Sequence, residues 1–113
     1  MLSVSSLQIS PGNSNHYSDS FRNLIENHLH ALRNDKSTLL TSLTVHDEDV
    51  FIGDFYGLLQ KININQDMFW IIMRINNLHS PLDYTGTFGS ILIPSANTIT
   101  ILLTRHINAV INS

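Results

Sequence analysis

Short apolar segments separated by turn-forming residues make up the stretch "GDFYGLLQKININQDMFWIIMRINNLHSPLDYTGTFGSILIPS", residues 53–95. Asn65 is placed to cap a helix, and Asn76-Asn77 can adopt the left-handed conformation that ends one. Apolar residues recur between these caps at helical spacing; they are Met68, Ile71, Ile72 and Ile75. We therefore expect a short helix here, then a loop, then the buried strand "ILIP" closed by Pro94.

The preceding segment "STLLTSLTV", residues 37–45, is rich in threonine and β-branched residues, which favours a strand. Asp47 in "HDED" can cap a following helix, whose positive end suits acidic residues. One face of that helix is apolar, with Phe51, Phe55, Leu58, Leu59 and Ile62. Gly53 and Gly57 lie one turn apart on it, which lowers helix propensity but lets another backbone come close. The order strand, helix, helix, strand predicts an α+β core with two helices packed on an antiparallel pair.

Four segments follow from this pattern: an extended arm over residues 1–17, an amphipathic helix over 18–36, the α+β core over 37–95, and an extension over 96–113. The arm is rich in Ser, Asn, Pro and Gly, which is typical of a loose segment, and the alternative is an arm that becomes ordered against a neighbouring chain. The extension is ambiguous, because "TITILL" alternates like a strand and "LLTRHINAVIN" repeats like a helix.

The charge content is low for a soluble surface. The chain has 113 residues, a net charge of −3 and 13% charged residues, and its six Lys and Arg are dispersed. Nucleic-acid binding is therefore not expected, since it needs clustered basic residues. We expect partner proteins to cover part of such a surface. A signal peptide is not expected, because the N-terminal sequence lacks a basic region followed by a long apolar run. A membrane-spanning helix is not expected either, because no apolar run approaches about 20 residues.

The ordered set of residues from Leu39 to Pro94 resembles the lysin motif (LysM), whose pattern is a strand, a helix ending near Tyr-Gly, a helix ending in Asn, and a Gly-x-x-Ile-x-Ile-Pro strand. The matching positions are Tyr56-Gly57, Asn76, Pro81 and Gly89-Ser90-Ile91-Leu92-Ile93-Pro94. The Gly-Asp-Thr that opens sugar-binding LysM repeats is missing, and "HDED" stands in its place.

One subset of this family is more similar. Phe69-Trp70-Ile71-Ile72 followed by Asn76 looks like a region of LysM-like baseplate wedge proteins in phage tails and related contractile injection machines. This resemblance implies a structural adaptor, located in the virion tail and in the host cytoplasm during assembly. Its partners would be other tail and baseplate proteins, in many copies within a large assembly.

The adaptor hypothesis places a partner interface on apolar and aromatic positions, since aromatic residues dominate interface energetics. The candidates are Phe21, Phe69, Met73 and Ile107. Phe69 and the adjacent Trp70 cannot point the same way on a helix, and we favour Trp70 as the core residue. The alternative is a glycan-binding LysM module that docks peptidoglycan in a groove between residues 49–53 and 78–85. Its candidate groove residues are Asp49, Asn77 and Tyr84.

Catalytic, cofactor and metal chemistry are not expected. The chain has no cysteine, and His28 and His30 are two positions apart on a helix, so they face different directions. The acidic run Asp47-Glu48-Asp49 fits a solvated first helical turn, because no calcium-loop pattern follows it. No nucleophile motif surrounds any serine. We therefore expect a protein that is not an enzyme.

Overall fold

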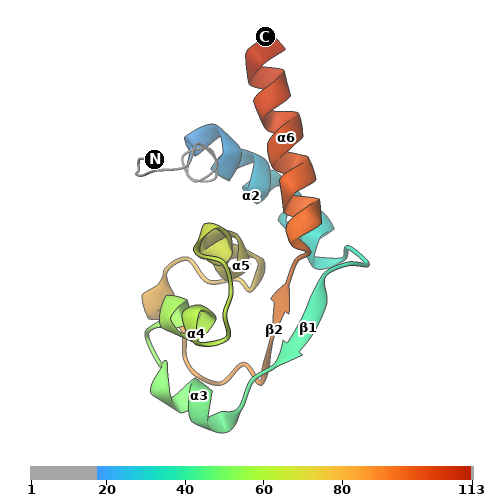
Figure 1. Ribbon diagram of the computed structural model, residues 1–113. Coiled ribbons are helices and arrows are strands. Elements are labelled where there is room, and N and C mark those ends of the chain that lie inside the picture. The colour runs from blue at the N-terminus through green and yellow to red at the C-terminus, as the bar shows by residue number, and fades with distance from the viewer. Residues whose placement is uncertain (1–17, 113) are drawn as a thin grey trace. The chain divides into compact units, whose positions relative to one another are not determined.

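The computed structural model describes residues 18–112, with side chains for residues 18–109; the arm predicted over residues 1–17 lies outside this range. In this part of the chain helices and two strands combine into an α+β fold, which confirms the predicted class (Figure 1). The elements are α2 (Asp19–Arg33), β1 (Leu39–Ser42), α3 (Val45–Val50), α4 (Phe55–Lys61), η1 (Gln66–Met68), α5 (Phe69–Ile75), η2 (Pro81–Asp83), β2 (Ser90–Ile93) and α6 (Ala96–Asn112), where η marks a 3₁₀ turn.

The chain divides into two compact units. The first unit comprises Met1–His28 with Ala96–Ser113, and the second comprises Leu29–Ser95. Within the first unit the Ser20 hydroxyl and the His106 Nε2 atom lie 3.0 Å apart, and the Phe21 ring lies 5.7 Å from the His106 ring. The C-terminal extension, ambiguous in sequence, is thus a helix, and it buries Ile99 and Leu103.

The second unit contains the expected antiparallel pair. β1 and β2 form a two-stranded sheet in which Leu39 is opposite Ile93 and Ser42 is opposite Ser90. The two strands lie side by side in Figure 1. A further bond from the Leu43 N–H to the Gly89 carbonyl, 2.9 Å long, extends the pairing beyond the strand ends.

The predicted long helix after β1 is wrong: the segment forms two helices, α3 and α4. Thr44, rather than Asp47, caps α3, because its hydroxyl accepts a bond from the Asp47 N–H at 3.0 Å. Gly53, with a φ of +74°, interrupts the helical conformation between α3 and α4. The Asp54 carboxylate then caps α4 by accepting the Gly57 N–H at 3.0 Å. A side chain at position 57 would meet that carboxylate, so Gly57 accommodates a cap and not a neighbouring backbone.

Both α4 and α5 end in the same turn, which uses an asparagine with positive φ. Asn63 has a φ of 66° after α4, and Asn77 has a φ of 68° after α5. The next residue in each case, Ile64 or Leu78, donates its N–H to a carbonyl five positions back, namely Leu59 and Met73. These are Schellman caps, in which asparagine tolerates the left-handed conformation. The expected cap at Asn65 is confirmed at η1, and of the pair Asn76-Asn77 only Asn77 adopts the left-handed conformation, since Asn76 has a φ of −90°.

The core of the second unit lies between α4, α5, η2 and β2, which contact one another. It contains side chains that are at most 1% exposed, namely Phe55, Leu58, Leu59, Ile71, Ile72, Ile75, Tyr84 and Ile91. Of the two strands, β2 faces this core through Ile91, whereas β1 has no buried residue. This asymmetry decides which parts of the unit remain available to a partner.

Candidate functional site

Glu48 is a buried carboxylate that the sequence interpretation treated as part of a solvated acidic run. Its side chain is only 7% exposed. Its Oε1 atom accepts bonds from the Tyr84 hydroxyl at 2.9 Å, the Phe88 N–H at 2.7 Å and the Gly89 N–H at 3.0 Å. A buried carboxylate is tolerated only when its acceptor sites are filled in this way. Glu48 thus fastens α3 to the loop that leads into β2, and the expectation of a solvated run is wrong for this residue.

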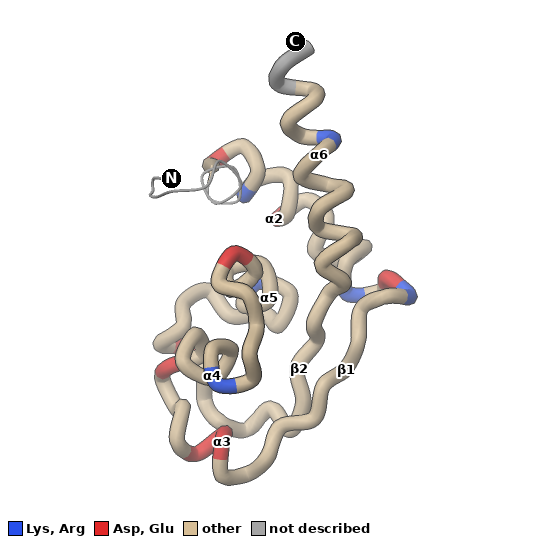
Figure 2. The backbone as a smooth tube through the Cα atoms, viewed as in Figure 1, with Lys and Arg blue, Asp and Glu red and all other residues tan. Residues whose placement is uncertain are grey.

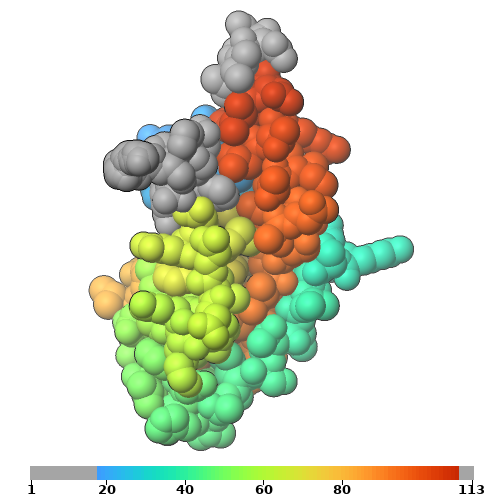
Figure 3. All heavy atoms as spheres, in the orientation of Figure 1, coloured from blue at the N-terminus to red at the C-terminus, as the bar shows by residue number. Residues whose placement is uncertain are grey.

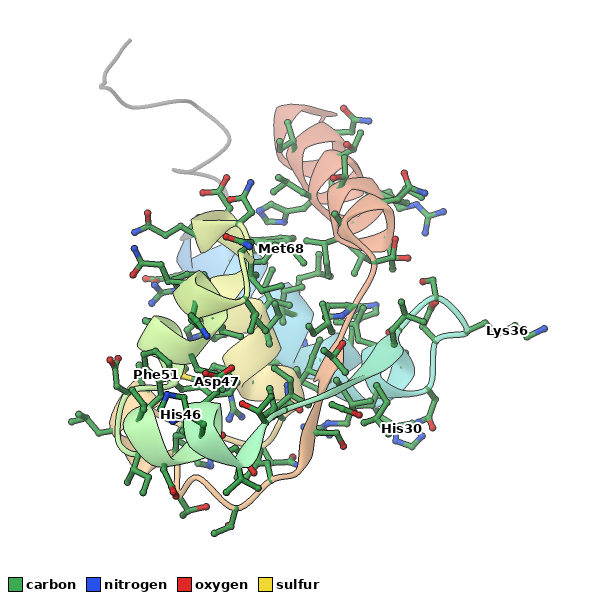
Figure 4. All side chains as sticks on the ribbon, turned by 60° about the horizontal axis from the view of Figure 1, so that its bottom comes forward. His30, Lys36, His46, Asp47, Phe51 and Met68 are labelled. Carbon is green, nitrogen blue, oxygen red and sulfur yellow. The ribbon has the colours of Figure 1, made fainter. Side chains whose placement is uncertain are left out.

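A sequence signal for this role exists, although the acidic neighbours of Glu48 conceal it. Glu48 is three positions before Phe51, which is half-buried, so helical spacing places its side chain near an apolar residue. Asp49 lies on the exposed side of α3. Asp47 bonds instead to Lys61 of α4, with 3.0 Å between Oδ1 and Nζ. That hydrogen bond lowers the pKa of Asp47; Figure 4 labels Asp47 with His46 and Phe51.

Tyr84, a candidate groove residue, belongs to the core. Its side chain is 1% exposed, and its ring lies 5.3 Å from the Phe55 ring and 5.1 Å from the Phe88 ring. Burial raises the pKa of its hydroxyl the most, and the hydrogen bond to Glu48 raises this pKa further. The Tyr84 carbonyl also accepts the Gly53 N–H at 2.8 Å. The ring is therefore not available to stack on a sugar.

Gly86 brings the loop after Tyr84 close to α3. A Cβ atom at this position would lie 2.6 Å from Ile52 Cγ1 and 2.7 Å from the Glu48 carbonyl oxygen. Its φ of +75° also favours glycine. The loop can thus reach the Glu48 carboxylate only because residue 86 has no side chain.

Asn76 binds the backbone of β2 with its side-chain amide. Its Nδ2 atom donates to the Leu92 carbonyl at 2.9 Å, and its Oδ1 atom accepts the Leu92 N–H at 2.8 Å. An amide that pairs with both groups of one residue imitates the next strand of a sheet. The Asn of the LysM-like pattern therefore closes the edge of β2 that faces away from β1.

Asn77, the second candidate groove residue, is exposed and takes part in a helix end. Its Oδ1 atom accepts a bond from Arg33 Nη2 at 2.7 Å. Arg33 also donates to the carbonyls of Ile75 at 2.8 Å and Arg74 at 3.2 Å. A guanidinium at a helix C-terminus satisfies carbonyls that lack partners within the helix. Asn77 thus belongs to the attachment, within the second unit, of the last turn of α2 to the end of α5.

The predicted partner-interface residues are mostly inside the structure. Phe21, Met73 and Phe69 are 0%, 2% and 9% exposed. Trp70 is half-buried, so the interpretation that Trp70 is the core residue and Phe69 the outer one is reversed. Ile107 is half-buried on α6. A side chain in the core cannot act as a surface anchor, so Phe21, Met73 and Phe69 are not available to a partner, whereas Ile107 remains a candidate.

The apolar surface lies on β1, on α3 and around the turn that follows α3. Six large apolar side chains of the second unit are more than half exposed: Leu39, Leu40, Val45, Val50, Ile52 and Leu82. Ile52 and Leu82 belong to adjoining segments, because Gly53 bonds to Tyr84 and lies close to the Leu82 carbonyl. We name Val50, Ile52 and Leu82 the α3 rim. β1 and β2 have no charged residue, whereas Figure 2 shows acidic residues on α3 beside the rim.

Residues 18–112 contain no group of three or more His, Cys, Asp or Glu side chains placed to hold a metal ion. In the same range no helix is both long and apolar enough to cross a membrane. Comparison with protein-family models, curated proteins and solved structures finds no match for this chain.

Proposed function

We propose that this protein is a structural adaptor of a phage tail or baseplate, or of a related contractile injection machine, and that it acts by protein–protein assembly. The observation that carries the proposal is the exposure of six large apolar side chains on a unit of 67 residues. Large apolar side chains left exposed together on a small domain favour contacts with other proteins, and three of these six gather in the α3 rim. The tail location rests on the LysM-like order of residues described above.

The surface is distinct from the core residues that the sequence suggested. Two hydrogen-bonded contacts hold the segments of the α3 rim within the unit itself, namely Glu48 to the β2 loop and Gly53 to Tyr84. A preformed apolar surface loses little conformational entropy on association. These features suit a subunit that positions its neighbours in an assembly.

A co-expression experiment tests the proposal. The chain is produced together with the proteins encoded by neighbouring genes, and stable complexes are detected by size-exclusion chromatography. We expect a complex, and we expect Leu82→Lys to weaken it because Leu82 is 78% exposed on the α3 rim. Gln60→Lys on α4 is the matched control, since Gln60 is exposed and lies outside the rim.

A pull-down on insoluble peptidoglycan separates this proposal from the glycan-binding alternative. An adaptor remains in the supernatant, whereas a LysM sugar-binding module is retained. Retention that is lost in Asp49→Ala or Asn77→Ala would favour the alternative. Failure of the chain to bind any neighbouring gene product would overturn the adaptor proposal.

A further inference from the structure

The outer edge of β1 presents backbone groups that are not bonded within the described residues. Opposite residues of an antiparallel pair alternate between those that bond each other and those whose N–H and C=O point away. The Leu92 groups bond to Asn76, so the Leu40–Leu92 pair is of the second kind, and so is Ser42–Ser90. Leu40 and Ser42 therefore direct two N–H and two C=O groups outward from β1.

These four groups have a spacing that matches a second copy of the same strand. If an identical strand runs antiparallel with Thr41 opposite Thr41, Leu40 of one copy is opposite Ser42 of the other, and the reverse also holds. Each such pair forms two backbone bonds. In this twofold-symmetric arrangement, all four outward groups of each copy form hydrogen bonds with the other copy.

The side chains around this axis are compatible with the same register. On one face Leu39 would be opposite Leu43 of the other copy and Thr41 opposite Thr41, which are favourable cross-strand pairs. Natural sheet edges usually avoid self-pairing through charged residues or proline. Residues 37–45 contain neither, and the nearest charged side chain before β1, Lys36, points away from the rest of the unit (Figure 4).

The edge is also open to approach. Leu39 and Leu40 are 67% and 68% exposed although they point to opposite faces of the strand. In the space-filling view the teal segment that contains β1 lies at the outer edge of the second unit, and the turn before it projects outward (Figure 3). Burial of Leu39 and Leu40 would supply apolar stabilisation in addition to the backbone bonds.

We propose that two copies of this chain associate through their β1 strands, antiparallel and centred on Thr41, to form a four-stranded sheet. The inference rests on the proposed adaptor function and names one of its partners as a second copy. The contact is short, so it belongs to the weak class that forms at high local concentration, such as within an assembly.

Cysteine cross-linking of the purified full-length chain tests the register, because the natural sequence has no cysteine. In Thr41→Cys the two thiols are directly opposite, with Cα atoms about 4.5 Å apart, which a disulfide accepts. In Leu40→Cys the matching thiols are diagonal, about 7 to 8 Å apart between Cα atoms, which is too far. We expect oxidation to dimerise Thr41→Cys much faster than Leu40→Cys. Equal rates, or no dimer from Thr41→Cys, would overturn the proposal.

Analytical ultracentrifugation of the purified full-length chain without cysteine substitutions tests whether two copies associate. We expect a concentration-dependent dimer, weakened roughly tenfold or more by Leu40→Lys through lost apolar contact and edge charge. Leu82→Lys, the same change at a site that is also largely exposed but lies away from β1, is expected to leave the dimer intact. A purified chain that stays monomeric while it binds products of neighbouring genes would overturn this inference and leave the adaptor proposal standing.

Hydrogen exchange identifies the occupant of the edge. Protection of the Leu40 and Ser42 amides that rises with concentration supports a second copy. Protection independent of concentration would mean that the chain covers its own edge, for example with "LSVSSLQIS" of residues 2–10, and would overturn the proposal. Protection that appears only when a different protein is added would also overturn it.

Discussion

The two strands of the sheet differ in what lies along their outer edges. β2 is bonded through Leu92 to the Asn76 amide, and the loop that leads into it is bonded to the Glu48 carboxylate. β1 has no such contact at Leu40 or Ser42 within the described residues, and it buries no side chain. One strand is integrated into the unit, and the other is held mainly by pairing with its neighbour.

This difference assigns the two strands separate roles: β2 contributes to the stability of the fold, and β1 has backbone groups that a partner can bind. Polar side chains at β2 satisfy backbone groups that would otherwise need water or another strand. The same kinds of groups on β1 remain available to a partner. We therefore expect changes around β2 to destabilise the fold and changes on β1 to alter association. Four predictions test this division, and a fifth concerns the ion pair between α3 and α4.

The largest effect is expected from Glu48→Ala. The change leaves the Tyr84 hydroxyl and two backbone N–H groups without their acceptor, which costs about 3 kcal/mol in free energy of unfolding. Urea denaturation measures it. Asp49→Ala on the exposed side of α3 is the matched control, with a change within about 0.5 kcal/mol. Equal effects at both positions would show that Glu48 does not fasten the loop.

Asn76→Ala should destabilise the unit by about 2 kcal/mol, because the Leu92 N–H and C=O lose their partner. It should also expose the edge of β2, so that the Leu92 amide exchanges faster with solvent. Hydrogen exchange followed residue by residue measures this local change. Unchanged protection at Leu92 would remove the contrast between the two strand edges.

Gly86→Ala and Gly89→Ala form a matched pair, since their φ angles are 75° and 74°. An alanine at position 89 meets no atom within 4 Å, so it should cost only the left-handed strain of about 1 kcal/mol. An alanine at position 86 also meets Ile52 and the Glu48 carbonyl, and should cost about 2 kcal/mol. Thermal denaturation compares them. Equal losses would mean that the loop does not need to approach α3 closely.

Leu40→Thr should change the free energy of unfolding by no more than about 0.5 kcal/mol when measured at low protein concentration, because Leu40 is largely exposed. Ile91→Thr, the same type of change on β2, is the contrast, since Ile91 is fully buried and its loss costs about 2 kcal/mol. A large loss from Leu40→Thr would show that β1 is integrated as β2 is.

The smallest effect concerns Asp47 and pH. Its pKa in the folded chain is below the ordinary value of 3.8 because Lys61 donates a hydrogen bond to it. Its contribution to stability is therefore present above 3.8 and is lost as the pH falls through the lower, folded pKa. Lys61→Gln should reduce this acid sensitivity, measured by urea denaturation at neutral pH and below 3.8. The change is expected to be small, since exposed ion pairs stabilise little.

Local patterns in the sequence predicted much of the fold. The α+β class, the strand near Leu39, the caps at Asn65 and Asn77 and the helix of α5 all follow from residues that act within one or two turns of the chain. The break between α3 and α4 could also have been read from Gly53 and the Asp54 cap, but helical apolar spacing across it concealed the signal. The C-terminal segment fits both the alternation of a strand and the spacing of a helix, and in the structure it forms the helix α6.

Three adjacent acids show where local reasoning ends. Their sequence determines that Asp47, Glu48 and Asp49 occupy successive positions of one short helix. Only the tertiary structure decides that Glu48 meets Tyr84, Phe88 and Gly89, that Asp47 meets Lys61, and that Asn76 rather than a third strand covers β2. Caps and periodicities arise from neighbouring residues, whereas burial and hydrogen-bond partners depend on segments that are distant in the chain. The sequence by itself therefore determined most of the helices and strands, and the tertiary structure decided which of their surfaces remain exposed.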